Sequence, residues 1–191
     1  MYVIVITAGR GNKSRYITNS FDRFYSIDLD MMENKMIILV NDPDVEEIIF
    51  GGAIGGDTIL LFYALKHRKG NRPKLTVVLP VDLKFQAQET REITKRADRI
   101  IEMKQNIFDA KCNFNNGMYK ARNEEMIKRG LENGRDVRVE ALWSGVKSYS
   151  GTYSTIVLAQ KKYQIPVTIT KFNSNNSKIK PNLSIKKRYK D

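Results

Sequence analysis

The chain has 191 residues, a net charge of +12 and a hydrophobic content of 41%. That length is typical of one domain that buries a core without disulfides or structural metals. One cysteine, Cys112, excludes an internal disulfide, and together with one histidine, His67, it is too small a set for a His/Cys metal site or for most histidine-based catalysis. We therefore expect no metal and no cofactor. The positive charge favours anionic partners, either nucleotides or nucleic acid, although lysine-rich chains are also basic without such a partner.

The first predicted element is a strand over residues 2–7, a run rich in β-branched residues that is typical of a central parallel strand. Because this run follows Met1 directly, there is no signal-peptide pattern, and no apolar run reaches membrane-spanning length. We expect a cytoplasmic protein with no membrane partner. The strand ends at Gly9 and Arg10, which suit phosphate recognition because a guanidinium pairs with phosphate through two hydrogen bonds. A solvent-exposed turn with an ordinary surface arginine fits the same residues.

Residues 12–29 show no clear period and contain several aromatic and basic residues, which favours a loop over the site. A helix is predicted over residues 30–41, with Asp30 as its N-cap and Asp42-Pro43 as its stop. Residues 37–40 also fit a short strand.

The sequence Gly-Gly-Ala-Ile-Gly-Gly-Asp at residues 51–57 is the turn around which the chain is organised. Three apolar residues precede it and a long apolar run follows, which predicts a strand, a tight turn and a buried helix. Gly52 and Gly55 let the backbone approach a phosphate closely, and a helix start offers unpaired N–H groups and a favourable dipole. Asp57 suits either a helix cap or a ribose hydroxyl. A plain strand-to-helix turn is the competing interpretation.

Three shorter elements follow this turn and its helix. We predict a strand over residues 75–79, an outer polar helix over residues 86–97 and a short strand over residues 99–103. His67 is expected at the surface, near the end of the preceding helix.

The next helix is predicted over residues 117–134, with two polar residues, Arg122 and Asn123, on its apolar stripe. Burying a charge without a partner is costly, so both residues need partners. The first turns of a helix in a parallel α/β protein lie at the edge where ligands bind. We expect both side chains to face a ligand there, and pairing of Arg122 with an internal carboxylate such as Glu140 is the alternative.

The last part of the predicted domain repeats the strand-turn-helix arrangement. Alternation over residues 137–143 predicts a strand, and Ser150-Gly151-Thr152 opens a helix that runs to about Lys162, before a last strand over residues 167–169. Ser-Gly-Thr at a helix start supplies two hydroxyls, one permissive backbone position and free N–H groups, which together suit an anion. As a plain N-cap, Ser150 would need no ligand.

These elements predict a single three-layer α/β/α Rossmann-like domain with a mostly parallel sheet over residues 1–170. Residues 171–191 form a basic C-terminal extension, because a polar run at residues 173–177 is followed by six Lys or Arg residues and one acidic residue, Asp191. Such a segment is usually a solvated extension, and it also suits contact with nucleic acid or with a neighbouring subunit.

The order of the motifs resembles the SLOG superfamily of Rossmann-like proteins over residues 2–169. The residues that carry this resemblance are Gly9-Arg10, the turn at residues 51–57, Arg122-Asn123 followed by Met126, and Ser150-Gly151-Thr152. The spacing looks closest to the YspA and YpsA type, and the DprA and LOG branches share parts of it. The resemblance implies a nucleotide or nucleotide-derived ligand, NAD-derived or cyclic, held across the strand ends by a homo-oligomeric sensing or sequestering module in signalling or phage defence.

Two other branches supply alternative functions. LOG enzymes hydrolyse nucleoside monophosphates with a Gly-Gly-x-Gly-Thr-x-x-Glu motif, but here Thr155 stands in place of the glutamate and the leading glycine pair is absent. Hydrolysis would then need Glu140 or Asp57 as the carboxylate beside the ribose. DprA binds single-stranded DNA and would suit the basic charge, although 191 residues leave no room for its additional domains.

Overall fold

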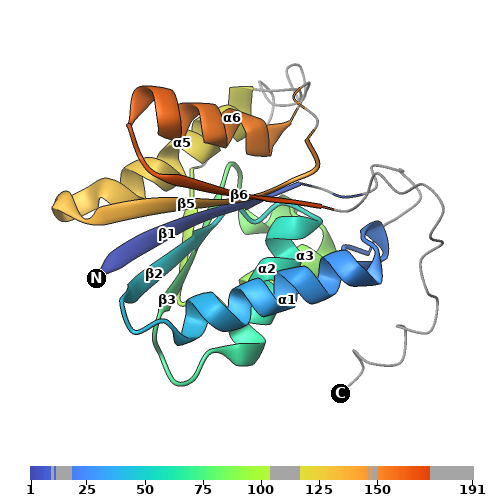
Figure 1. Ribbon diagram of the computed structural model, residues 1–191. Helices are drawn as coiled ribbons and strands as arrows, with labels where there is room; N and C mark the ends of the chain where they lie inside the picture. Colours follow the sequence, from blue (N-terminus) through green and yellow to red (C-terminus); the bar gives the residue numbers. More distant parts are fainter. Residues whose placement is uncertain (10, 12–18, 104–116, 146, 148–149, 173–191) are drawn as a thin grey trace.

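The computed structural model describes residues 1–9, 11, 19–103, 117–145, 147 and 150–172. These residues form one six-stranded parallel sheet, with helices packed on both of its faces (Figure 1). The strands are β1 (Tyr2–Ala8), β2 (Val45–Phe50), β3 (Lys74–Leu79), β4 (Arg99–Glu102), β5 (Asp136–Trp143) and β6 (Val167–Lys171). The helices are α1 (Ser26–Asn41), α2 (Gly56–His67), α3 (Gln88–Thr94), α5 (Gly117–Leu131) and α6 (Gly151–Val157), and a π-helical turn, Leu158–Lys162, continues α6. The predicted three-layer α/β/α architecture is confirmed.

The strand order is β4-β3-β2-β1-β5-β6, so the direction in which strands are added reverses at β1. Helices α1, α2 and α3 cover one face of the sheet, and α5 and α6 cover the other (Figure 1). In open parallel sheets, ligands bind outside the carboxyl ends of the strands where the order reverses. The strand order therefore predicts a ligand site at the carboxyl ends of β1 and β5.

Strand β1 shows how the two layers of core are built. Ile4 and Ile6 belong to the core under α1 and α2, whereas Val3 and Val5 belong to the core under α5, and none of the four is more than 1% exposed. A central parallel strand is covered on both faces, which explains a continuous apolar run instead of alternation with polar residues.

Three predicted helices differ from the observed ones, and one of them, α5, ends at Leu131 instead of residue 134. Helix α1 begins at Ser26 with Tyr25 as its N-cap, so Asp30 lies inside the helix and does not cap it. Leu29 is 3% exposed, and its packing stabilises a first turn that has no polar side-chain cap. The alternative of a strand over residues 37–40 is wrong, and α3 is shorter than the predicted helix over residues 86–97.

The predicted loop over residues 12–29 lies only partly within the described residues. There, Phe21–Arg23 forms a 3-10 turn and the first turn of α1 begins at Ser26. Among the described residues, no helix is both long and apolar enough to cross a membrane.

Candidate functional site

The end of β1 is fixed between β5 and the start of α2. The amide of Gly9 donates to the carbonyl of Leu142 in β5 at 3.0 Å, and its own carbonyl accepts from the amide of Gly56 at 3.2 Å. A Cβ at Gly9 would lie 3.4 Å from the ring of Phe172. Gly9 is therefore placed at the point where the strand order reverses, while Arg10, predicted beside it, lies outside the described residues.

The glycines at residues 51–57, which we call the α2 turn, are required by the protein's own packing. A Cβ at Gly51 would overlap the guanidinium of Arg122, and a Cβ at Gly56 would overlap the side chain of Ala8 and lie 2.6 Å from the carbonyl oxygen of Gly9. Gly52 has a φ of 60°, and its Cβ would overlap Leu79. Gly55 has a φ of 102°, a conformation that side chains disfavour. The glycine pattern is explained without a bound phosphate.

Amides of the α2 turn are also used within the chain. The amide of Gly55 donates to Ser20 Oγ at 3.0 Å, and Ser20 itself is fully buried. The amide of Ala53 donates to Asp57 Oδ2 at 3.4 Å, and the amide of Gly56 to Gly9 as described above. Three donors that a phosphate would need thus have acceptors already, so the α2 turn is closed.

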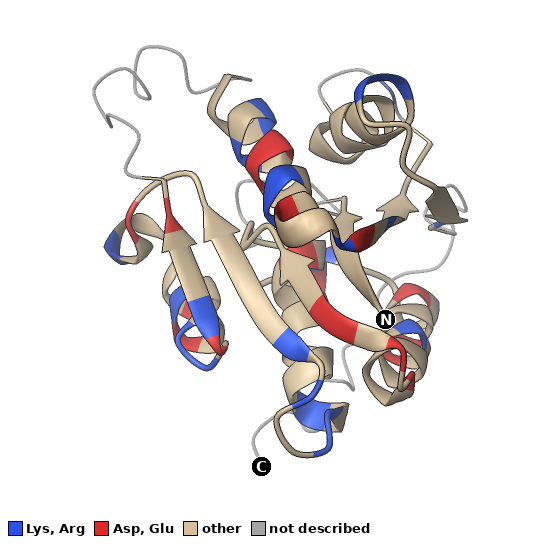
Figure 2. Cartoon of the chain, turned by 90° about the vertical axis from the view of Figure 1, so that its left-hand side faces the viewer, with Lys and Arg blue, Asp and Glu red and all other residues tan. Residues whose placement is uncertain are grey.

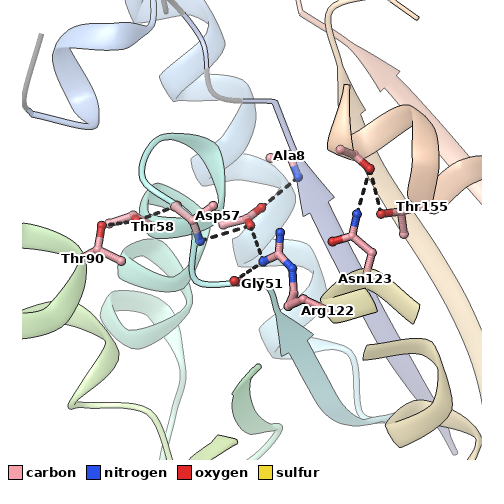
Figure 3. A network of polar contacts seen from close by, with 10 residues as sticks. Ala8, Gly51, Asp57, Thr58, Thr90, Arg122, Asn123 and Thr155 are labelled. Carbon is pink, nitrogen blue, oxygen red and sulfur yellow. Dashed lines mark hydrogen bonds and ion pairs between the residues drawn. The ribbon is translucent and has the colours of Figure 1, made fainter. Parts of the chain in front are cut away.

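Asp57 does not cap α2, because Gly55 is the N-cap and Asp57 is the second residue of the helix. Its carboxylate is 5% exposed and accepts from the amide of Ala8 at 3.0 Å through Oδ1. Through Oδ2 it accepts from Ala53 and pairs with Arg122 Nη1 at 3.4 Å. Asp57 therefore joins the ends of β1 and β2 to the start of α2 (Figure 3).

Arg122 approaches this carboxylate from the opposite face of the sheet. It lies in the second turn of α5, its side chain is 6% exposed, and Nη1 donates to the carbonyl of Gly51 as well as to Asp57 (Figure 3). The ring of Tyr119 lies 5.7 Å from the guanidinium carbon. Arg122 lies at the carboxyl ends of the strands, and its acceptors in the described part of the chain are the carbonyl of Gly51 and the carboxylate of Asp57.

Arg122 pairs with an internal carboxylate, as the alternative interpretation predicted, but the carboxylate is that of Asp57 and not that of Glu140. Glu140 lies in the middle of β5, and its carboxylate pairs with Lys35 Nζ of α1 at 2.6 Å. Asp57 and Glu140 are both engaged in ion pairs inside the fold. Among the described residues, no cluster of His, Cys, Asp and Glu side chains suits a metal ion.

Asn123 links α5 to the start of α6. Its Nδ2 donates to the carbonyl of Gly151 at 3.0 Å, and this bond fixes the orientation of the amide (Figure 3). Asn123 is 1% exposed, and within the described part of the chain its Oδ1 has no hydrogen-bond donor. The side chain therefore positions the α6 start and also presents a buried acceptor.

The start of α6, residues 150–155, forms a second helix-start turn, which we call the α6 turn. Ser150 is the N-cap, and its Oγ accepts from the amide of Tyr153 at 3.1 Å. Thr155 Oγ1 donates to the carbonyl of Gly151 at 3.1 Å, so the residue in place of the hydrolase glutamate holds the helix start.

The α6 turn differs from the α2 turn in the use of its amides and in the room around its glycine. Among the described residues, no acceptor is bonded to the amides of Gly151 or Thr152. Gly151 is exposed, and a Cβ there would meet only Asn123 Nδ2, at 3.8 Å. This turn is open, with two donors at a helix start next to the end of β5.

Two further contacts hold α6 in place. The ring of Tyr153 stacks on Trp143 at the end of β5, with centroids 5.5 Å apart. At the other end, Glu124 of α5 accepts from Lys162 Nζ at 2.8 Å and from the Tyr163 hydroxyl at 2.9 Å. The hydrogen bond from Lys162, followed by that from Tyr163, lowers the pKa of Glu124 to about 2.

The sequence motifs therefore meet at one edge of the sheet but have different roles. Gly9, Gly52, Gly55, Asp57 and Arg122 form the closed part, and Asn123, Ser150, Gly151 and Thr152 form the open part. Sequence reasoning missed Ser20, since it follows a stretch without a period, and nothing local indicated that its hydroxyl reaches Gly55. No protein-family model matches the chain, and no curated protein matches it.

Proposed function

We propose that the protein binds a nucleotide or a nucleotide-derived small molecule, NAD-derived or cyclic, outside the carboxyl ends of β1 and β5. In this proposal it acts as a sensing or sequestering module. The observation that carries the proposal is the open α6 turn, where the amides of Gly151 and Thr152 have no acceptor among the described residues. Donors of this kind at a helix start favour a phosphate.

Asn123 supports the proposal through a different kind of contact. A buried amide oxygen without a donor is costly, and a ribose hydroxyl or an exocyclic amino group is a donor of the kind that Asn123 Oδ1 lacks. A ligand with a phosphate and a sugar or base would provide an acceptor for the two amides of the α6 turn and a donor for Asn123 Oδ1. A free inorganic anion would satisfy only the amides.

The alternative functions receive less support from the described residues. Hydrolysis of a nucleoside monophosphate needs a carboxylate beside the ribose, and both candidate carboxylates are held in ion pairs. For DNA binding, a continuous basic surface would be expected, whereas Figure 2 shows Lys and Arg interspersed with Asp and Glu over the described helices and strands.

Titration calorimetry of the full chain with nucleoside monophosphates, cyclic nucleotides and ADP-ribose tests the proposal. We expect binding of at least one compound, and loss of that binding in Gly151→Val, because its side chain would crowd the ligand, whereas its Cβ would lie 3.8 Å from Asn123 Nδ2, an ordinary contact distance. Gln160→Val is the matched control, because it adds a β-branched residue to the exposed far end of the same helical segment. Absence of binding by the intact chain, or equal binding by folded Gly151→Val, would overturn the proposal.

A further inference from the structure

The starts of the strands form an edge of the sheet opposite the candidate site, and we call it the amino edge. Three turns lead into it from helices on one face of the sheet, at residues 42–44 before β2, 68–73 before β3 and 95–98 before β4 (Figure 1). All three turns lie within the described residues. Their charges divide the amino edge into two parts of opposite sign.

The part of the amino edge at β3 and β4 is basic, and the turn before β3, at the bottom of Figure 2, carries Lys and Arg. Asp98 lies in this part, but its carboxylate is already held by the guanidinium of Arg68 and by the amide of Leu75, the latter at 2.7 Å. Five further cations are exposed, and among the described residues none of them has an ion-pair partner. These five, which we call the basic half, are Lys69, Arg72, Lys74, Arg96 and Arg99.

The neighbouring part of the amino edge, at the start of β2, is acidic. Asp42 accepts from the hydroxyl of Tyr2 at 2.6 Å, and this hydrogen bond lowers the pKa of Asp42, which keeps its carboxylate charged. Asp44 is exposed and Glu46 is half-buried, and neither is in an ion pair with another residue that the structure describes. We call Asp42, Asp44 and Glu46 the acidic half.

The two halves are direct neighbours. Strand β2 pairs with β3, with Glu47 opposite Lys74, and adjacent strands lie about 4.8 Å apart. Met1 lies between the halves, because its sulfur accepts from Arg72 Nη2 at 3.4 Å although β2 separates β1 from β3. Met1 is 75% exposed. The amino edge therefore has a cationic side, an anionic side and an exposed apolar side chain between them.

Few partners are complementary to such a surface. A nucleic acid that follows the basic half would be repelled at the acidic half, and a polycationic partner would meet the reverse problem. A second copy of the chain carries both halves, so it is complementary when each basic half lies against the acidic half of the other copy. Closed dimers of this kind use the same surface on both copies.

One two-fold axis produces this match. An axis perpendicular to the sheet, between β2 and β3, reverses the order of the strands but keeps α1, α2 and α3 of both copies on the same side. Strand β3 of one copy then faces β2 of the other, and the turn at residues 68–73 meets the turn at residues 42–44. A two-fold axis in the plane of the sheet would instead place β3 against β3 and like charges together.

We propose that two copies of the chain form a dimer through their amino edges, with the basic half of each copy against the acidic half of the other and Met1 near the axis. Methionine is enriched in the centre of protein interfaces, which suits this position. The dimer leaves the carboxyl ends of β1 and β5 uncovered in both copies. The proposal is therefore independent of the proposed nucleotide site, and either can fail without the other.

Sedimentation velocity of the full-length protein tests this dimer. We expect the intact chain to dimerise, and raising the salt from about 50 mM to about 500 mM should weaken the dimer, since exposed charges are screened. A first variant, Lys69→Glu with Lys74→Glu, reverses part of the basic half. A second variant, Asp44→Lys with Glu46→Lys, reverses part of the acidic half. Each change acts twice in a symmetric dimer, so either variant alone should dimerise at least about tenfold more weakly.

A mixture of the two variants is the decisive measurement, because their altered halves again have opposite charges. In equal amounts they should associate with each other about as tightly as the intact chain does with itself, which also shows that both are folded. The control variant, Lys120→Glu with Lys171→Glu, makes the same change in net charge as the first variant at exposed positions in the first turn of α5 and at the end of β6. It should dimerise like the intact chain.

Several results would overturn the proposal. An intact chain that stays monomeric excludes the dimer, and variants that dimerise as tightly as the intact chain exclude this surface. Equal weakening by the control would mean that net charge alone sets the association. Failure of the mixed variants to associate would contradict the pairing of opposite halves. A dimer that nuclease treatment dissolves would assign the contact to a bridging nucleic acid.

Discussion

The α2 turn and the α6 turn both contain glycine at a helix start, but they differ in whether their amides have acceptors among the described residues. Each places a glycine at the first position of a helix that follows a strand, close to the point where the strand order reverses. In the α2 turn the glycines make room for neighbouring groups, and three amides have acceptors within the chain. In the α6 turn, a Cβ at Gly151 would meet only Asn123 Nδ2 among the described residues, and two amides have no acceptor in that part of the chain. A glycine-rich helix start is therefore evidence for a ligand only when the glycine is not needed by the fold.

The largest effect should come from breaking the closed turn at its ion pair. Arg122→Ala would leave the carboxylate of Asp57 buried without its cation, which we expect to lower the free energy of unfolding by about 3–5 kcal/mol. Urea denaturation followed by circular dichroism measures this loss. Arg129→Ala in the same helix is the control, and we expect a loss of at most about 1 kcal/mol, since its pairs with Glu125 and Glu132 are partly exposed. If both variants lost similar amounts of unfolding free energy, the buried pair of Arg122 and Asp57 would not be what holds the α2 turn together.

The two first-position glycines offer the most direct comparison. Gly56→Ala should cost about 1–3 kcal/mol, because the new methyl overlaps Ala8 and the backbone of Gly9. Gly151→Ala should change the free energy of unfolding by no more than about 0.5 kcal/mol, because the site is exposed and has room. Urea titrations of the two variants measure these losses. A larger loss of unfolding free energy for Gly151→Ala than for Gly56→Ala would contradict the description of the α2 turn as closed and the α6 turn as open.

A smaller effect is expected from the cap of the open turn. Ser150→Ala removes the acceptor of the Tyr153 amide and should cost about 1 kcal/mol. Ser154→Ala, one turn later in the same helix, is the control and should cost less. Thermal unfolding by calorimetry measures both. If the two variants unfolded at the same temperature, Ser150 would not be a stabilising cap.

The smallest effect concerns the far end of α6 and depends on pH. The bonds from Lys162 and Tyr163 lower the pKa of Glu124 from 4.5 to about 2, so they stabilise the folded state fully above pH 4.5. This contribution should be lost as the pH falls from about 4.5 to about 2. The difference in unfolding free energy between the wild type and Glu124→Gln, followed over that range, should shrink toward zero. A difference that does not change with pH would contradict the link.

Much of the fold follows from local patterns in the sequence. The continuous apolar run of β1 and the buried stripe of α5, including Asn123 and Met126, were predicted because each depends on residues close in the chain. The start of α1 was missed because packing of Leu29, rather than a polar cap, stabilises its first turn.

Local sequence patterns could not predict which of the two turns has amides that are already hydrogen-bonded within the chain. The sequence places Gly55 and Gly151 in similar contexts, but the acceptor for Gly55 comes from Ser20, 35 positions away. The competing interpretation predicted that Arg122 pairs with an internal carboxylate, and it named Glu140 as an example, whereas the fold brings Asp57 to Arg122 from the opposite face of the sheet. Contacts between distant parts of the chain decide which helix start is open.

The pairing of β1 with β5 also has a consequence for synthesis of the chain. Tyr2 pairs with Val45 on one side and with Asp136 on the other. During translation, β1 to β4 and their helices emerge as consecutive units, but the second edge of β1 waits for about 130 residues, or roughly 7–26 s at 5–20 residues per second. For that time Val3 and Val5 lack the layer formed by α5, and the edge is open to other chains. The nascent protein is therefore exposed to misassembly at its first strand, although residues 3–6 of that strand are buried in the finished molecule.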